Sequence, residues 1–586
     1  MNMIHLKIDN HEIEVPEGTT ILEAAKIVQV DIPTLCHHPD LIPNAGCGIC
    51  IVKVNGRMLR SCCTTCTEGM DVITRDPDIV EARRTVLKLI LSHHPNECLT
   101  CLKNGCCELQ DLATKFHIPQ NSFMNIVPSA EDLPLDDSTK CIQLDPRKCI
   151  LCGRCVQVCQ KVQNIWALSF LERSVNTHIA PAGGVCLGNS PCIKCGQCTA
   201  HCPTGALTEV DETERVWKYL QDPAKHCVVQ IAPSIRVALG EAFGYKSGEL
   251  VTGKLYTALR RMGFDAVFDT NFGADLTIME EASEFVERFT KAPEKLPLIT
   301  SCCPAWVDYL EKFDGSMIPH FSTAKSPQAM LGVLAKTYYA QKKGLDPKDI
   351  VVVSIMPCTA KKFEIIRSEE MFLDGVIQNV DVSLTTRETV RMIKQMGIEF
   401  RDLPEETADS PLGQYSGAGT IFGFSGGVME AALRTAHFLI TGSETDDLEM
   451  RTITDLDKGV KELTMQVAGK EVRIGVAHGI ANVEYLLNKV KAAKDAGEET
   501  PYHFIEVMAC PGGCIGGGGQ PLGVTQKIRK ARQQGLMKDD EKSKVRRSHQ
   551  NPDIQKLYDE FLGHPLSEKA HELLHTHYVE RPLYKR

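Results

Sequence analysis

The chain has 586 residues, 26 of them cysteine, and a formal net charge of −10 at pH 7 with acidic and basic residues interspersed. This length predicts several domains with ample hydrophobic core, and the cysteine content indicates metal sites rather than a small disulfide-stabilised protein. The charge argues against a nucleic-acid or anionic-membrane partner, and without a signal-peptide pattern or a run of ~18 apolar residues we expect a soluble, cytoplasmic protein with no membrane span.

Residues 1–78 have the pattern of a small β-rich domain. Alternating apolar residues over 4–15 predict a β-hairpin with a turn at Glu17-Gly18, residues 20–28 have helical spacing, and a strand precedes Asn55-Gly56, a typical hairpin turn. Four cysteines that include one Cys-x2-Cys pair indicate either a 2Fe–2S cluster or a zinc ion. The candidate ligands are Cys36, Cys47, Cys50 and Cys62, with Cys63 and Cys66 as alternatives to the last.

Residues 79–140 begin with a predicted amphipathic helix and continue into a second group of candidate ligands. The helix spans about 78–92 and places Val80, Val86 and Leu87 on its apolar face. It leads into the pattern His94-x3-Cys98-x2-Cys101-x5-Cys107. Taken alone, this pattern fits zinc nearly as well as iron, and a single histidine at the end of a helix is more often a capping or surface residue.

Residues 141–210 hold the strongest pattern that the residues show by themselves. Two runs repeat the spacing Cys-x2-Cys-x2-Cys-x3-Cys of bacterial ferredoxins, in which the fourth cysteine of each run ligates the cluster of the other run. The sequence therefore predicts one 4Fe–4S cluster on Cys149, Cys152, Cys155 and Cys202, and another on Cys192, Cys195, Cys198 and Cys159. The first run lacks the usual trailing proline, because Gln160 occupies that place. This spacing nearly excludes zinc.

The region 211–540 alternates apolar strands and helices as a large α/β domain does, and an amphipathic tail follows over 541–586. Three of the apolar strands are each followed by cysteine: Cys302 and Cys303 after 296–299, Cys358 after 351–355, and Cys510 and Cys514 after 504–507. Because α/β sheets bind ligands beyond the carboxyl ends of their strands, these cysteines are predicted to form one site. Buried cysteines are common small hydrophobes, but five of them after three strands are poorly explained in that way.

Three segments of this region resemble the active-site signatures of the iron-only (FeFe) hydrogenases. They are Thr300-Ser301-Cys302-Cys303-Pro304, Met356-Pro357-Cys358-Thr359-Ala360-Lys361-Lys362 and Glu506-Val507-Met508-Ala509-Cys510-Pro511-Gly512-Gly513-Cys514. The resemblance extends to about Tyr578 and is greatest to the catalytic subunit of multi-subunit NADP-reducing hydrogenases. It implies a multidomain α/β protein with a β-grasp 2Fe–2S ferredoxin-like domain (1–78), a small His/Cys3 4Fe–4S domain (79–140), a double 4Fe–4S ferredoxin domain (141–210), a two-lobed α/β H-cluster domain (211–540) and a helical tail that resembles the hydrogenase small subunit (541–586).

The resemblance also implies the cofactors. It favours one 2Fe–2S cluster with Cys62 as fourth ligand, and three accessory 4Fe–4S clusters, one of them ligated by His94. The catalytic H-cluster would consist of a 4Fe–4S cubane joined through Cys514 to a two-iron subcluster with carbon monoxide, cyanide and a dithiolate bridge. The cubane ligands implied are Cys303, Cys358, Cys510 and Cys514.

Further residues receive roles from the same resemblance. Lys361 would donate to one cyanide, Pro233 and Ser234 would line the other, and Met356 and Met508 would pack against the two-iron unit.

A proton path is implied over Cys302, Glu281, Ser322 and Glu284 to solvent, with Arg288 near its mouth. Adjacent strand residues point to opposite sides, which would leave Cys302 free beside the ligand Cys303. Its thiol, with an ordinary pKa of ~8.5, would suit proton relay. Glu281 and Glu284 are three residues apart and can share one helix face, although a solvated helix face is the commoner explanation of such a pair.

The implied reaction interconverts dihydrogen with protons and electrons. The chain itself shows no nucleotide-binding fingerprint, because Gly248-x4-Gly253-Lys254 lacks the Ser or Thr of a P-loop and no Gly-x-Gly-x-x-Gly occurs. Electrons would therefore reach NADP or NAD through a flavoprotein NAD(P)-binding subunit and a small 2Fe–2S subunit of a hetero-oligomer, with ferredoxin as a further candidate partner.

Two other interpretations compete with a hydrogenase. A non-catalytic electron-transfer subunit like that of complex I agrees with the first 210 residues but not with the three signatures. A hydrogen-sensing or iron–sulfur assembly relative is disfavoured because Cys302, Glu281 and Glu284 are all present.

Overall fold

The computed structural model describes residues 2–119, 133–444, 453–467 and 469–584. Its strands are β1 (Met3–Ile8), β2 (His11–Pro16), β3 (Ile51–Val54), β4 (Arg57–Arg60), β5 (Met70–Ile73), β6 (Ile142–Leu144), β7 (Ser169–Leu171), β8 (His178–Ala180), β9 (Leu207–Glu209), β10 (His226–Ile231), β11 (Ala266–Asp269), β12 (Leu298–Ile299), β13 (Ile350–Met356), β14 (Phe372–Leu373), β15 (Ile377–Gln378), β16 (Val382–Thr385), β17 (Val460–Val467), β18 (Lys470–His478) and β19 (Phe504–Met508). Its α-helices are α1 (Ile21–Ile27), α2 (Pro77–Leu91), α3 (Glu108–Lys115), α4 (Arg154–Gln157), α5 (Gln197–His201), α6 (Thr213–Leu220), α7 (Thr252–Arg261), α8 (Thr270–Lys291), α9 (Pro304–Phe313), α10 (Pro327–Leu334), α11 (Ala340–Lys343), α12 (Lys361–Glu364), α13 (Thr386–Gln395), α14 (Gly417–Ile421), α15 (Gly427–Thr441), α16 (Ile480–Ala496), α17 (Gln526–Lys542), α18 (Pro552–Leu557) and α19 (Glu568–Leu574).

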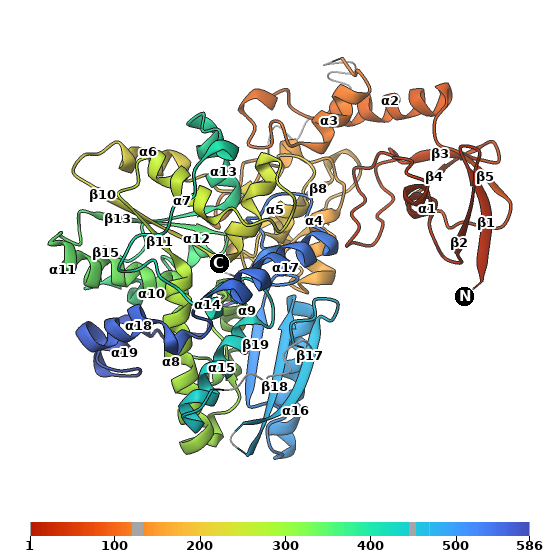
Figure 1. The fold of residues 1–586 in the computed structure, drawn as a ribbon. Helices are drawn as coiled ribbons and strands as arrows, with labels where there is room; N and C mark the ends of the chain where they lie inside the picture. Colours follow the sequence, from red (N-terminus) through yellow and green to blue (C-terminus); the bar gives the residue numbers. More distant parts are fainter. Residues whose placement is uncertain (1, 120–132, 445–452, 468, 585–586) are drawn as a thin grey trace.

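The amino-terminal β domain lies to one side of a much larger body, and α2 and α3 run across the top between them (Figure 1). Its sheet has the order β2-β1-β5-β3-β4, with β1 antiparallel to β2 and parallel to β5. Helix α1 begins at a capping box in which Thr20 and Glu23 satisfy each other's backbone N–H groups. The predicted hairpins are therefore confirmed, but the first one turns at Asp9 and Asn10, which both have positive φ, and not at the Glu17-Gly18 pair that follows β2.

Helix α2 differs from its prediction in which residues it buries. Ile79, Arg83 and Leu87 form the buried stripe at four-residue spacing, whereas Val80 is exposed. The prediction for Val80 was wrong because a helix turns by about 100° per residue, so the neighbour of a buried residue lies toward solvent.

The ferredoxin-like segment, residues 141–210, is built from two short strand pairs, β6–β9 and β7–β8, and the two short helices α4 and α5. Helices α4 and α5 each follow a glycine in the left-handed conformation, Gly153 with φ 76° and Gly196 with φ 72°. A residue with a side chain is strained in that conformation, so glycine allows each cysteine loop to turn directly into a helix.

The large body contains two four-stranded sheets. One has the order β11-β10-β13-β16 and is parallel throughout; the other has the order β12-β19-β18-β17, of which only β17 is antiparallel. The long helix α8 packs against both α15 and α10 and runs down the middle of the body (Figure 1). The three strands that precede cysteine are thus divided between sheets, with β12 and β19 adjacent in one and β13 in the other.

The carboxy-terminal tail packs against the large body, as its amphipathic pattern predicts. Ile554, Leu557 and Leu574 are fully buried in the core cluster that includes α8 and α10. Burial of each such side chain contributes about 1.5–3 kcal/mol. Beyond α19, Arg581 forms ion pairs with Asp308 and Glu311 at 2.5 Å. Among the described residues, no helix is long and apolar enough to cross a membrane.

Candidate active site and accessory cysteine sites

A cavity lies where the carboxyl ends of β12, β13 and β19 meet. Most of the residues assigned to the catalytic cofactor line it: Cys302, Cys303, Cys358, Cys510, Cys514, Lys361, Pro233, Met356 and Met508. Ser234 does not line it; this residue is fully buried, and its hydroxyl accepts a hydrogen bond from Gln520 at 3.1 Å. The structure therefore brings together cysteines that are up to 212 positions apart in the chain, counting from Cys302 to Cys514.

Cys302 and Cys303 do not stand on a strand. Strand β12 ends at Ile299, and Cys303 is the residue that caps α9, with Pro304 at the first helical position. The alternation argument assumed that both cysteines stand on the strand, and the strand ends before them, although the backbone of Cys303 is still extended. The separation of their roles stays a prediction. Both residues reach the cavity from a loop.

The donor chemistry of the cavity fits an iron–sulfur cubane. Burial raises the pKa of Cys303, Cys358, Cys510 and Cys514, and neighbouring thiolates raise it further for the last three. Burial and mutual repulsion disfavour four thiolates in one cavity, and a bound cationic centre would offset both effects. Thiolate rather than thiol is the form that ligates metal. Among the described residues, no group of three or more His, Cys, Asp or Glu side chains is arranged to hold a single metal ion.

Lys361 supplies a buried positive charge to the same cavity. Its ammonium contacts both oxygens of Glu364 at 3.0 and 2.8 Å and the carbonyl of Cys302 at 3.2 Å. Burial lowers the pKa of this ammonium, but Glu364 more than offsets that effect, so the net pKa lies above its ordinary value. Glu364 also accepts hydrogen bonds from Ser326 and Gln328 at 2.7 Å each. Sequence reasoning missed Glu364, although its place three residues after Lys361 in one helix is a usable signal.

The residues of the implied proton path lie next to one another. Glu281, Glu284 and Arg288 follow one face of α8. Ser322 donates to Glu284 at 3.0 Å, and Arg288 donates to the other oxygen of Glu284 at 2.6 Å. One oxygen of Glu281 is buried and has no hydrogen-bond partner among the described residues.

Burial controls protonation along this path. The pKa of Glu281 is raised to about 8, mainly by burial and then by the charge of Glu284, while a hydrogen bond with Ser322 acts in the opposite direction. Burial, followed by Glu281, raises the pKa of Cys302 well above its ordinary value. The expectation that Cys302 titrates near the working pH was therefore wrong: desolvation disfavours the thiolate and holds Cys302 as a thiol.

The second amino-terminal site contains an imidazole ready to bind metal. His94, Cys98, Cys101 and Cys107 line one cavity. The Nδ1 atom of His94 lies 3.1 Å from the carbonyl of Pro95, and its buried Nε2 has no partner among the described residues. A proton on Nδ1, donated to that carbonyl, leaves the Nε2 lone pair free as a ligand. A surface or capping role does not explain this arrangement.

In the amino-terminal β domain, two thiol pairs form. Cys36 is hydrogen-bonded to Cys47, and Cys50 to Cys62. Cys62 is buried, whereas Cys63 is exposed. The geometry therefore favours Cys62 over Cys63 as the fourth member of this set.

The ferredoxin-like segment groups its cysteines as the two crossed sets. Burial raises the pKa of Cys149, Cys152 and Cys155, and the adjacent Cys202 raises it further. The other set, Cys159, Cys192, Cys195 and Cys198, lines a cavity of its own. Burial also raises the pKa of Cys195, and the next largest cause is Cys510 of the catalytic cavity. The second set therefore lies beside that cavity.

Glycines allow this close approach. A Cβ added to Gly518 would clash with the carbonyl of Cys195, and one added to Gly517 with the carbonyl of Pro357. The glycine run at residues 516–519 thus packs closely against the segments that carry Cys195 and Pro357. Within this run, only Gly517 lines the catalytic cavity.

Comparison with known proteins gives matches along most of the chain. Residues 225–518 match the iron only hydrogenase large subunit, C-terminal domain, and residues 526–581 the iron hydrogenase small subunit. Residues 1–77 match a 2Fe-2S iron-sulfur cluster binding domain, residues 83–122 the NADH-ubiquinone oxidoreductase-G iron-sulfur binding region, and residues 189–208 a 4Fe-4S binding domain.

Individual relatives agree with these matches. The chain is 47% identical to the NADP-reducing hydrogenase subunit HndD of Solidesulfovibrio fructosivorans, over 99% of the chain and 100% of that protein. It is 39% identical to iron hydrogenase 1 of Clostridium pasteurianum, over 97% of the chain and 99% of that protein. The solved apo [FeFe]-hydrogenase HydA1 of Chlamydomonas reinhardtii superposes with a TM-score of 0.56 at 43% identity, covering 64% of this chain and 100% of that one.

Proposed function

The chain belongs to the iron-only hydrogenase family, and from that premise we propose that it is a hydrogenase catalytic subunit that interconverts dihydrogen with protons and electrons. The observation that supports this most directly is the cavity lined by Cys303, Cys358, Cys510 and Cys514, with Lys361 and the thiol of Cys302 at its wall. A cofactor that holds four thiolates and an anionic group would match this combination of ligands and charge.

The family's cofactor, the H-cluster, would supply the metal chemistry that cleaves and forms dihydrogen. Cys303, Cys358, Cys510 and Cys514 would hold it, and the Lys361 ammonium, kept charged by Glu364, would hydrogen-bond an anionic ligand. Pro233, Met356 and Met508 give the rest of the cavity an apolar wall that excludes water. Ser234 would act one step further out. Its hydroxyl accepts a hydrogen bond from Gln520, and Gln520 also donates to the carbonyl of Cys514, a proposed ligand.

We propose that protons move between the cavity and solvent through Cys302, Glu281, Ser322 and Glu284. Cys302 would give up its proton at Sγ and regain one from Glu281, whose pKa of about 8 keeps the carboxyl group able to donate and accept near neutral pH. Ser322 would pass a proton through its hydroxyl, since it bonds Glu284 and also contacts Glu281. Arg288 would orient Glu284 through their 2.6 Å ion pair.

Electrons would travel through four accessory clusters. We propose one 2Fe–2S cluster on Cys36, Cys47, Cys50 and Cys62, a 4Fe–4S cluster on His94, Cys98, Cys101 and Cys107, and two more on the crossed ferredoxin sets. The sheet order of the amino-terminal domain supports its description as β-grasp. The domain divisions at residues 78, 140, 210 and 540 are part of this proposal.

The need for partner subunits follows from the lack of a nucleotide-binding fingerprint in the sequence of this chain. The relative HndD is a subunit of an NADP-reducing hydrogenase. We propose that this chain likewise delivers electrons to NADP or NAD through a flavoprotein subunit and a small 2Fe–2S subunit, with ferredoxin as an additional candidate. The chain alone should then reduce artificial dyes with dihydrogen but not NADP; robust NADP reduction by the isolated chain would contradict this part.

Anaerobic purification with infrared spectroscopy tests the catalytic assignment. Bands of bound carbon monoxide and cyanide, together with hydrogen evolution from reduced viologen, are the expected result. A protein with full iron content that lacked those bands and had no activity with viologen would instead be an electron-transfer subunit.

A further inference from the structure

Arg154 lies at the meeting point of the three amino-terminal cluster sites. It is the first residue of α4, directly before Cys155, and its side chain is only 4% exposed. A buried guanidinium needs hydrogen-bond partners for its donors, and here the partners come from three different parts of the chain.

Each partner is adjacent in sequence to a proposed cluster ligand. The guanidinium donates to both oxygens of Glu108, at 2.6 and 2.8 Å, and Glu108 follows Cys107. It donates to the carbonyl of His37 at 2.8 Å, and His37 follows Cys36. It also donates to the carbonyl of His201 at 3.4 Å, and His201 precedes Cys202.

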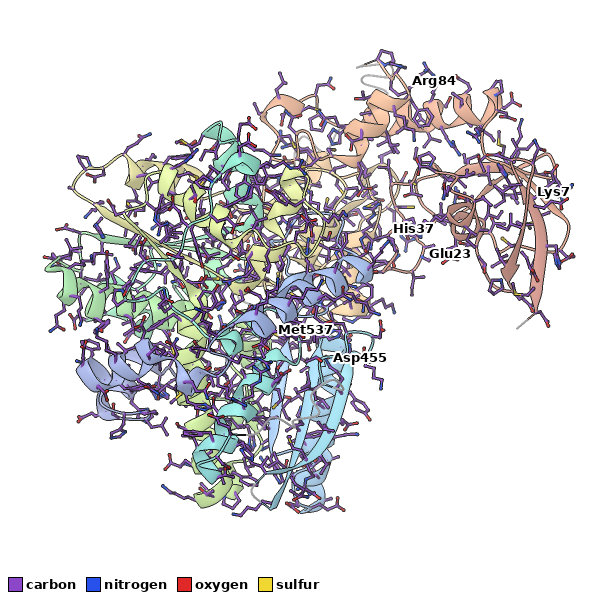
Figure 2. The ribbon with its side chains drawn as sticks, viewed as in Figure 1. Lys7, Glu23, His37, Arg84, Asp455 and Met537 are labelled. Carbon is purple, nitrogen blue, oxygen red and sulfur yellow. The ribbon has the colours of Figure 1, made fainter. Side chains whose placement is uncertain are left out.

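Two further contacts reinforce the same junction. The rings of His38 and His201 lie 4.5 Å apart, which brings the loop after Cys36 against the helix before Cys202. The side-chain amide of Asn44 donates to the carbonyl of Cys152 at 2.9 Å. Figure 2 shows His37 on the side of the amino-terminal domain that faces the large body, whereas Lys7 lies on the opposite side.

We propose that Arg154 is the positioning residue of an electron-transfer branch point: its guanidinium fixes the 2Fe–2S site and the His94 site at once against the cluster site of Cys149, Cys152, Cys155 and Cys202. This inference rests on the proposed function, because it concerns clusters assigned there. During dihydrogen oxidation, Cys149, Cys152, Cys155 and Cys202 would hold a cluster that gives up one electron, and the residues of one of the two branches would hold the cluster that takes up that electron. No atom is transferred in this step, and the final oxidant is the partner's flavin or an added viologen.

The planar fork of arginine explains why this residue type is needed. It can serve a carboxylate in two parallel bonds and still donate to carbonyls at other angles, which a lysine ammonium cannot reproduce. Electron tunnelling slows steeply as the donor and acceptor separate, so holding three sites with one rigid group fixes both branches together. Among the described residues, the side-chain hydrogen bonds of Arg154 go to Glu108 and to the carbonyls of His37 and His201 and not to a proposed ligand sulfur, so it acts through its neighbours.

The test uses the full chain, purified anaerobically, with the variants Arg154→Lys, Arg154→Ala and Glu108→Gln. Pulsed paramagnetic resonance of the reduced protein measures magnetic coupling between clusters, and hydrogen exchange measures protection of residues 37–44 and 108–115. Both Arg154 variants should weaken coupling on both branches and raise exchange in both segments. Glu108→Gln should affect only the His94 branch and residues 108–115. Iron content and the infrared bands of the catalytic site should not change.

Arg84→Lys is the matched control. Arg84 also donates to a carbonyl, that of Phe116 at the end of α3, at 2.7 Å, and pairs with Glu81 on its own helix α2, but it lies away from the junction (Figure 2). This control should behave like the unaltered chain. Unchanged coupling and exchange in Arg154→Lys would overturn the proposal, as would loss of iron from the Cys149 set, which would make Arg154 a support of one site only. If the unaltered chain shows no accessory-cluster signals, the assigned cofactors are wrong, and the exchange measurement still decides whether Arg154 joins the three segments.

Discussion

The catalytic cavity and the amino-terminal cluster sites hold cysteines in opposite ways. The first two amino-terminal sites draw partly on short loops, as in Cys98 and Cys101 or Cys47 and Cys50, and Cys63 remains exposed beside them. The catalytic cavity draws on strand ends of two separate sheets, and the pKa of every thiol in it is raised by burial. The difference lies in how far apart in the chain the ligands are and not in burial alone, because burial also raises the pKa of Cys149, Cys152 and Cys155.

The largest effect is expected in the catalytic cavity, from removal of the Cys302 thiol. Cys302→Ala should lower turnover by about 10²–10⁴-fold, the usual contribution of a positioned acid–base group, while all iron and both kinds of diatomic ligand are retained. Hydrogen evolution from reduced viologen and infrared spectroscopy measure the two quantities. Cys227→Ala, a buried cysteine in another core cluster, is the control and should keep full turnover. Loss of the cofactor would make Cys302 a ligand, and full activity would place the proton path elsewhere.

The second effect tests whether the two regions are mechanically independent. Glu209 ends the ferredoxin-like segment and pairs with Arg387 at 2.6 Å and Arg391 at 2.8 Å in the large body. Glu209→Gln removes the carboxylate that Arg387 pairs with and leaves Arg391 with only Asp211, 3.5 Å away, so the free energy of unfolding should fall by about 3–5 kcal/mol. Chemical denaturation under anaerobic conditions measures the change. The exposed pair of Glu212 and Arg215 provides the control, since Glu212→Gln should cost less than about 1 kcal/mol. Equal small losses in both variants would indicate that the regions are only loosely joined.

The third effect is a pH dependence of the free energy of unfolding that arises from the buried carboxyl group of Glu281. Because the pKa of Glu281 is about 8 in the folded protein and 4.5 is its ordinary value, the folded state binds more protons than the unfolded state between those pH values. The contribution of this group is therefore fully present below pH 4.5 and is lost as pH rises through 8, by up to about 1.4 kcal/mol per pH unit. Glu281→Gln should remove that loss, so its stability relative to the unaltered chain should rise between pH 5 and 8. Glu287→Gln, on the exposed face of the same helix, should show no such trend.

Substitution of a cysteine in the amino-terminal sites is expected to have the smallest effect on the catalytic cavity. Cys98→Ser or Cys36→Ser should leave the infrared bands of the cavity unchanged, because neither residue lines it. Reduction of a large protein acceptor should fall several-fold, while viologen, which can reach inner clusters, should still be reduced. Disappearance of the infrared bands in either variant would show that the two regions are not separable in this way.

Several features were predictable because they depend on residues close together in the chain. Alternating apolar residues predicted the hairpin of β1 and β2, and the helical spacing of Glu281 and Glu284 placed them on one face of α8. In each case bond geometry and short-range periodicity limit the chain to one arrangement.

What only the tertiary structure decided depends on contacts between distant residues. The sequence did not show that β13 lies in a different sheet from β12 and β19, or that Val80 faces solvent. Nor did it show that one oxygen of Glu281 lacks a hydrogen-bond partner in the part of the chain that the structure describes. It also assigned Cys302 an ordinary thiol pKa, because the desolvation that raises it comes from segments more than fifty residues away, such as the strand end at Cys358. Spacing in the sequence thus determined which residues are candidates, and burial decided their charge, because the energy of an ionised group depends on everything packed around it.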